Sequence, residues 1–128
     1  MRSRARRPRL AHCVAAALAL LAFAAHAAEP LPLAELARPG RVLMLRHANA
    51  PGVGDPPGFR LDDCSTQRNL DATGRAQAAK LGERLATAGI ALPRVYSSQW
   101  CRCLETARLL QLGPVRELPA LNSFYGRA

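Results

Sequence analysis

The chain alternates between short apolar runs and longer stretches in which apolar residues recur at helical spacing. The apolar runs predict three strands, at Arg41 to Arg46, Arg94 to Ser97 and Val115 to Leu118. The amphipathic stretches between them predict two helices, so strand and helix alternate along the chain. This order is typical of an α/β fold, and we expect a three-layer sandwich with a mostly parallel sheet.

Both predicted helices have recognisable ends. The first begins after the N-cap Asp71 and ends before Gly89, with an apolar face made of Ala78, Leu81, Leu85 and Ala88. The second runs from about Trp100 to Leu110 and takes Ser97 or Ser98 as its cap. We expect the first helix to cover the predicted sheet.

Residues 1–27 have the composition of a secretory signal peptide. A head with five arginines precedes an apolar stretch from Leu10 to Ala25, and Ala25-His26-Ala27 fits a small-x-small cleavage site. The stretch is short and Ala-rich for a lasting membrane anchor, so we expect a periplasmic or secreted protein. Cleavage leaves 13 of the 18 Lys and Arg residues against 9 Asp and Glu, dispersed without basic runs. A small anionic ligand fits this balance better than a nucleic acid.

Two later segments lack regular periodicity. Residues 28–40 contain three prolines and predict an extended lead-in with at most one helical turn, at Leu33 to Ala37. Ala48 to Asn69 forms a long stretch rich in Gly and Pro, and a loop of this length inside a compact domain is usually functional. The remaining length gives room for one domain, over residues 41–128.

The first predicted strand ends in Arg46-His47, and His47 is the last histidine of the chain. Such a strand brings a cation and an imidazole to the edge where open α/β sheets bind ligands. Near the start of the second predicted helix, Arg102 and Thr106 lie one turn apart on one face. There a guanidinium can join the helix N-terminal amides in holding a phosphate. Together the two patterns indicate a phosphate site.

Three motifs, in the order of a known family, carry a resemblance. Arg46-His47-Ala48 resembles the Arg-His-Gly signature of the histidine phosphatase superfamily, which includes the phosphoglycerate mutases. Residues 68–78 are similar to its Arg-Pro-Leu-Thr-x-x-Gly-x-x-Gln-Ala segment, and residues 97–107 resemble its Ser-Ser-x-x-x-Arg-x-x-x-Thr-Ala segment. These motifs span most of the chain from residue 41 to residue 107.

The resemblance implies phosphoryl transfer through a covalent histidine intermediate, with no metal or cofactor. His47 would be the nucleophile, Arg46 and Arg102 would hold the phosphate, and Arg68 would add a third contact. We expect a phosphomonoester hydrolase for a small phosphorylated molecule or a phosphorylated envelope component, and the alternative among enzymes is a lipopolysaccharide heptose phosphate phosphatase. The alternative from another class is a non-catalytic phosphate-binding module.

Two departures from the family pattern accompany the resemblance. Ala48 replaces the usual glycine, and no histidine follows His47, although the family has a second one on a later strand. We therefore expect residues 41–128 to be the N-terminal part of a histidine phosphatase domain that is truncated at its C-terminus. The sheet would then be incomplete, and the hydrolase activity is expected of the full-length protein.

The motifs leave the proton donor open. Residues 121–123 resemble the Leu-Asn-Glu stretch of the mutases, with Ser123 at the acidic position, which argues against a mutase. Asp55, in the long loop, is the candidate acid. Asp62 and Asp63 are alternatives, and all three also suit a turn or the surface.

Three cysteines follow the signal peptide, an odd number for an exported protein. One disulfide and one buried thiol is the simplest arrangement. A bridge between Cys64 and Cys101 would tie together the segments that carry Arg68 and Arg102, and Cys103 is the competing partner.

Overall fold

The computed structural model describes residues 31–91 and 94–123. The predicted signal peptide, residues 1–27, lies outside these ranges, as do residues 92–93 and 124–128. The chain divides into two units at Leu31, and the description below concerns the unit from Pro32 onward. None of the helices in the described ranges has the length and hydropathy of a membrane span.

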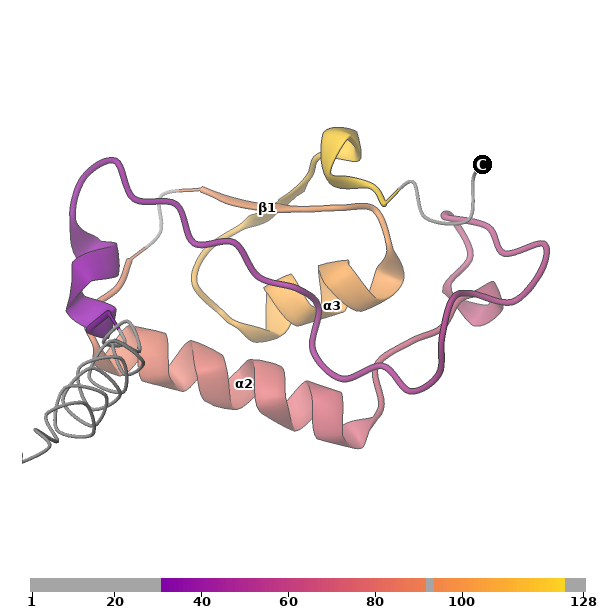
Figure 1. Ribbon diagram of the computed structural model, residues 1–128, viewed down its shortest axis with the longest axis horizontal. Helices are drawn as coiled ribbons and strands as arrows, with labels where there is room; N and C mark the ends of the chain where they lie inside the picture. Colours follow the sequence, from indigo (N-terminus) through magenta and orange to yellow (C-terminus); the bar gives the residue numbers. More distant parts are fainter. Residues whose placement is uncertain (1–30, 92–93, 124–128) are drawn as a thin grey trace, which may run out of the picture. The chain divides into compact units, whose positions relative to one another are not determined.

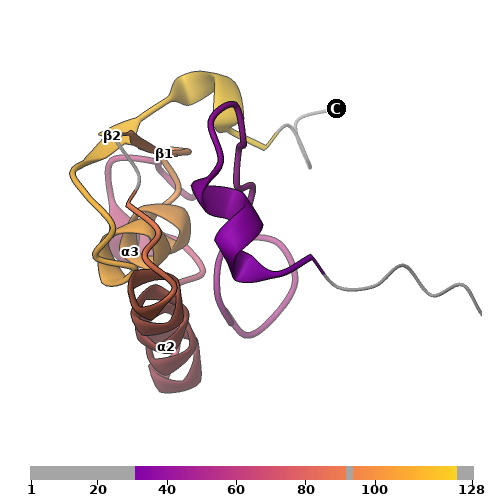
Figure 2. The same ribbon diagram turned by 90° about the vertical axis from the view of Figure 1, so that its left-hand side faces the viewer.

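The described unit is α/β, as the sequence predicts, with two α-helices and a two-stranded parallel sheet (Figure 1). These elements are α2 (Ala72–Thr87), β1 (Val95–Ser97), α3 (Cys101–Leu109) and β2 (Val115–Glu117). The sheet has Val95 opposite Val115 and Ser97 opposite Glu117. In both ribbon views α3 lies between the sheet and α2, so α2 packs against α3 and the prediction that it covers the sheet is wrong (Figures 1 and 2). The described residues therefore form one side of an incomplete α/β sandwich.

Helix α2 forms where the periodicity predicts it. The Asp71 side chain caps it by accepting a hydrogen bond from the Gly74 amide at 2.7 Å, and Gly89 follows its end with φ +72°. Its buried residues are Gly74, Ala78, Gly82 and Leu85. The predicted apolar face is thus largely confirmed, and two glycines extend it.

Helix α3 begins later than its predicted cap. Trp100 occupies the N-cap position without a side-chain hydrogen bond, so the prediction of Ser97 or Ser98 as the cap is wrong. Ser97 ends β1, and its hydroxyl donates to the Ser98 carbonyl at 2.9 Å instead. The backbone amide of Cys101 has no acceptor within the helix and donates to Oε1 of Gln67 at 2.9 Å. A distant side chain from the long loop therefore serves as the cap.

The predicted strand at Arg41 to Arg46 is absent. This segment pairs with no strand among the described residues, where β1 bonds only to β2. Val42 is 81% exposed and Met44 is 80% exposed, whereas Leu43 packs against the core. An apolar run fits a buried strand, but it fits equally an extended segment in which one residue faces inward, and periodicity cannot separate the two.

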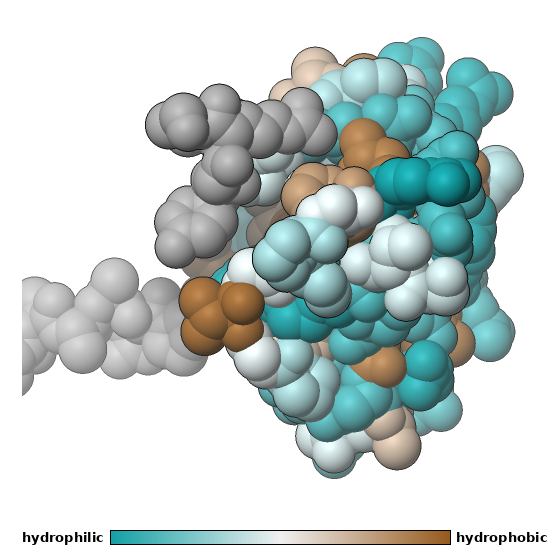
Figure 3. Space-filling view, turned by 90° about the vertical axis from the view of Figure 1, so that its right-hand side faces the viewer, coloured by the Kyte–Doolittle hydropathy of each residue, from teal (hydrophilic) through white to brown (hydrophobic). Residues whose placement is uncertain are grey.

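The remaining segments agree with the sequence. Leu33–Ala37 forms one short 3-10 helix in the lead-in, and the long loop contains a 3-10 turn at Cys64–Thr66 and an isolated antiparallel bridge between Arg60 and Asp63. A third 3-10 turn, Pro119–Leu121, follows β2. Figure 3, seen from the side of the long loop, has a mainly hydrophilic surface with brown residues scattered in small groups.

The small core lies at the C-terminal half of α2. Leu85, Ile90 and Leu110 form it, and Leu43 and Leu81 are among the residues that pack around it. Gly82 allows the two helices to approach closely there, because a Cβ at this position would overlap the backbone of Leu110. The opposite, N-terminal end of α2 is left to hold the loop that follows His47.

Candidate active site

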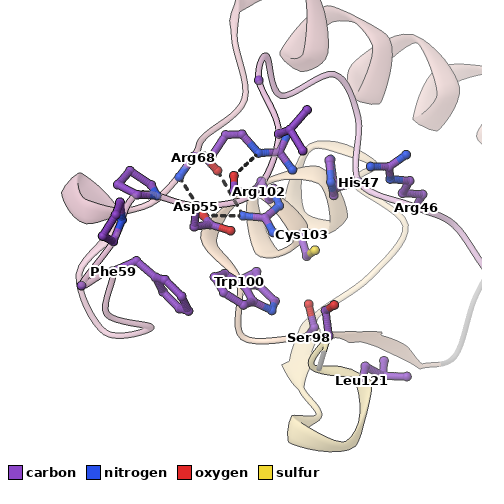
Figure 4. A pocket seen from close by; sticks show the side chains of 17 residues that line it. Arg46, His47, Asp55, Phe59, Arg68, Ser98, Trp100, Arg102, Cys103 and Leu121 are labelled. Carbon is purple, nitrogen blue, oxygen red and sulfur yellow. Dashed lines mark hydrogen bonds and ion pairs between the residues drawn. The ribbon is translucent and has the colours of Figure 1, made fainter. Parts of the chain in front are cut away.

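A cavity of about 840 Å³ lies between the loop after His47 and the start of α3 (Figure 4). Its ionisable lining includes Arg46, His47, Asp55, Arg68 and Arg102, and its apolar lining includes Val53, Pro56, Pro57, Phe59 and Leu121. The structure thus brings together all five residues to which the sequence assigns catalysis or phosphate binding. No local pattern in the sequence marks the apolar wall, because the path of the long loop brings its residues together.

His47 lies half-buried in the cavity with its ring in a defined orientation. Its Nδ1 is 2.7 Å from the carbonyl oxygen of Ala48. A carbonyl oxygen can only accept, so Nδ1 carries the hydrogen and the lone pair of the neutral ring is on Nε2. This tautomer leaves Nε2 available as a nucleophile or base.

The surroundings of His47 lower its pKa below the ordinary 6.5. Burial of the ring is the main cause, and the positive charges of Arg102, Arg68 and Arg46 act in the same direction. The hydrogen bond to the Ala48 carbonyl has the opposite effect. The net result favours the neutral imidazole.

The backbone after His47 is held by side chains from both helices. The Ala48 amide donates to Oγ1 of Thr106 at 3.0 Å, and the Thr106 hydroxyl donates to the Arg102 carbonyl at 2.7 Å. The Asn49 amide donates to Oε1 of Gln77 at 3.0 Å. The sequence pattern predicts no contact for Gln77 and places Thr106 only on the same helix face as Arg102. Their positions in the second and third motifs were the available signal.

Arg102 is nearly buried, with its side chain 8% exposed. Its Nη1 donates to Oδ1 of Asp55 at 2.9 Å and to the Arg68 carbonyl at 3.3 Å. Its guanidinium lies over the Trp100 ring, 4.6 Å from the centroid, and the Phe59 ring is also 4.6 Å from Trp100. Arg102 is therefore fixed by an ion pair and an aromatic face at once.

Arg68 lies half-buried on the loop side of the cavity. Its Nε donates to the Gly54 carbonyl at 2.7 Å and its Nη1 donates to the Ala50 carbonyl. Burial and the charge of Arg102 lower its pKa, yet a guanidinium keeps its proton at neutral pH. Arg68 thus brings positive charge to the cavity and also shapes the loop. Arg46, by contrast, is exposed at the edge of the cavity.

The disulfide joins Cys64 to Cys101, the first of the two pairings that the sequence allows. Cys103 is a free, half-buried thiol that lines the cavity. Gln67 reinforces the bridge, because its amide group also donates to the carbonyls of Arg60 and Leu61. The long loop is therefore attached to the start of α3 by a covalent bond and a buried amide.

Among the candidate acids, the structure separates Asp55 from the other two. Asp55 is the only carboxylic acid among the described residues that line the cavity. Asp62 pairs with Arg60 on the surface at 3.2 Å, and Asp63 caps the 3-10 turn through the Ser65 amide. Ser123 lines the cavity beside Leu121.

Comparison with known proteins gives one family. The model of the histidine phosphatase superfamily (branch 1) matches residues 42–126, which is most of the described unit, so the chain belongs to this superfamily. Searches of curated proteins and of solved structures give no match. The family therefore supports phosphatase-like activity in general and leaves the substrate to be argued from the site.

Proposed function

We propose that this protein is a phosphomonoester hydrolase that works through a phosphohistidine intermediate on His47. The observation that carries the proposal is the cavity itself, where a neutral imidazole with a free Nε2 lies among three arginines. Its substrate would be a small phosphorylated molecule, with no cofactor. Membership of the histidine phosphatase superfamily supports this chemistry.

The charges of the cavity suit a phosphomonoester dianion. Arg46, Arg68 and Arg102 against Asp55 give the lining a net charge of +2 when His47 is neutral. This balances the two negative charges of a phosphomonoester at neutral pH. Guanidinium groups also stabilise the charge that spreads over the equatorial oxygens during transfer.

In the first step, Nε2 of His47 forms a bond to phosphorus while the bond to the ester oxygen breaks. The alcohol leaves with a proton taken from a donor or from water. In the second step, water attacks phosphorus and returns one proton to the donor, the electron pair of the P–N bond goes back to Nε2, and inorganic phosphate leaves. The Nδ1–H bond to Ala48 keeps the ring in one tautomer throughout, as a positioned nucleophile requires.

Export belongs to the same proposal. The signal-like residues 1–27 and the Cys64–Cys101 disulfide both suit a periplasmic or secreted protein. In cells that make the whole chain, we expect mass spectrometry of the exported fraction to give a protein that begins at Ala28 or Glu29 and contains one disulfide. An uncleaved N-terminus held in the membrane would contradict export.

The decisive test compares His47→Ala with Arg84→Ala, an exposed control on α2 outside the cavity. We expect His47→Ala to abolish hydrolysis of p-nitrophenyl phosphate and to lose the acid-labile phosphate trapped on the wild-type protein. Arg84→Ala should behave as the wild type. Undiminished turnover by His47→Ala would refute the proposal. Phosphate binding by a wild-type chain without turnover or phosphohistidine would instead favour the binding module.

A further inference from the structure

The carboxyl group of Asp55 occupies an unusual place for a proton donor. Its side chain is 6% exposed, and its Oδ1 accepts from the Arg102 guanidinium at 2.9 Å and from the Arg68 amide at 2.9 Å. Both partners are donors, so both need Oδ1 as an acceptor. The Asp55 carboxylate is therefore held by two donors on one oxygen, and one of them is the guanidinium with which it forms a buried ion pair.

The same contacts connect Asp55 to two of the phosphate-binding arginines. It contacts the guanidinium of Arg102 directly, and it fixes the backbone of Arg68 from 13 residues earlier in the loop. The Arg102 guanidinium has the Trp100 face as a further support, 4.6 Å away. Figure 4 shows Asp55 between Arg68 and Arg102, with His47 on the far side of Arg102. Asp55 thus contacts the arginines and lies away from His47.

We propose that Asp55 is a positioning residue, and not the proton donor, whose carboxylate holds Arg102 and the Arg68 backbone in the geometry that binds the phosphoryl group. This inference rests on the proposed function, because it assigns the phosphoryl group to the same cavity. Phosphate binding and catalysis both depend on an acidic residue of the long loop, which the family motifs do not contain.

The two roles of Asp55 give different leaving-group dependence. Loss of a general acid slows the hydrolysis of esters with poor leaving groups, such as alkyl phosphates, far more than that of p-nitrophenyl phosphate. The p-nitrophenolate group leaves without protonation. Loss of a positioning carboxylate weakens the hold of Arg102 on the phosphoryl group itself. The cost is then the same for both esters, and inorganic phosphate also binds less well.

The experiment uses the full chain with Asp55→Asn, which keeps the size of the side chain and one oxygen acceptor. Asp62→Asn is the matched control, because Asp62 is an exposed carboxylate outside the cavity. We expect Asp55→Asn to lower kcat/KM about 10- to 100-fold for p-nitrophenyl phosphate and for glycerol 2-phosphate alike, with weaker inhibition by inorganic phosphate. Asp62→Asn should change neither ester.

A double-mutant cycle keeps the test independent of folding. If Asp55 acts through Arg102, Asp55→Asn should cost little once Arg102→Ala is present, and circular dichroism melting should verify that each variant is folded. Additive losses would overturn the proposal. So would a loss confined to glycerol 2-phosphate, which would make Asp55 the acid.

Failure of the proposed function is distinguishable from failure of this inference. If the wild-type chain has no turnover, calorimetric titration with inorganic phosphate still compares it with Asp55→Asn. Weaker binding by Asp55→Asn would uphold the positioning role although hydrolysis fails. Equal binding would overturn it.

Discussion

The two segments that flank His47 are held in opposite ways. Before it, residues 41–46 run extended with no strand partner among the described residues, and Val42 and Met44 face solvent. After it, Ala48 and Asn49 are bound by side chains of α3 and α2. The helices, and not the sheet, therefore position the candidate nucleophile in the described structure.

The largest effect should come from the contact between α2 and Asn49. A Gly→Ala change inside a helix ordinarily stabilises a protein by about 1 kcal/mol. In Gly74→Ala, however, the new Cβ would overlap the carbonyl oxygen of Asn49. We expect the free energy of unfolding in urea to fall by about 3 kcal/mol, with loss of activity. Ala76→Gly, at an exposed position of the same helix, should cost only about 1 kcal/mol. A Gly74→Ala protein more stable than the wild type would refute this anchor.

The contact from α3 should have the next largest effect. Thr106→Val keeps the shape of the side chain but leaves the Ala48 amide without its acceptor. An unsatisfied donor of this kind costs about 1–3 kcal/mol, and kcat/KM should fall as His47 loses its fixed backbone. Thr106→Ser keeps the hydroxyl and should retain most of the activity. If the two variants have the same free energy of unfolding in urea and the same kcat/KM, the Thr106 hydroxyl does not hold the Ala48 backbone.

The pKa of His47 should report the charges on both of its flanks. NMR titration of the imidazole should give a pKa below 6.5, and Arg46→Gln should raise it, because one of the charges that lowers it is gone. The folded-state pKa is the lowered one, so the stability contributed by His47 is fully present above pH 6.5. It is lost as the pH falls through the folded pKa. A wild-type pKa above 6.5 would contradict the described surroundings of the ring.

The smallest effect should come from the segment before His47. Val42→Thr and Met44→Gln should change the free energy of unfolding by less than about 0.5 kcal/mol, because both side chains are exposed. Leu43→Ala should cost roughly 1.5 kcal/mol, because Leu43 packs against the core. If all three variants were equally destabilising, the segment would be covered in solution and the contrast between the flanks would disappear.

Local patterns predicted the elements that depend on local physics. The span of α2, its Asp71 cap and the Gly89 that follows it come from propensity, capping and the freedom of glycine at positive φ. The cap of α3 could not be predicted in this way. It comes from Gln67, 34 residues earlier, and only the folded loop brings that side chain to Cys101.

The residues of the site also differ in whether the sequence predicts them. Motif residues such as His47, Arg68 and Arg102 could be predicted because the family resemblance marks them, and the structure places them around one cavity. The partner of Arg102 could not be predicted. Asp55 lies 47 residues earlier, in a loop whose path depends on the disulfide and on buried amides.

The Cys64–Cys101 bridge has a consequence for the unfolded chain. It closes a loop with a sequence separation of 37, which contains α2 and β1. Such a loop lowers the conformational entropy of the denatured ensemble, and in the chain-entropy description this corresponds to about 4 kcal/mol at 25 °C. Arg68 and Arg102 follow the two cysteines closely in sequence. An oxidised chain that unfolds therefore keeps these two cations tethered near each other, and refolding begins with part of the distance already closed.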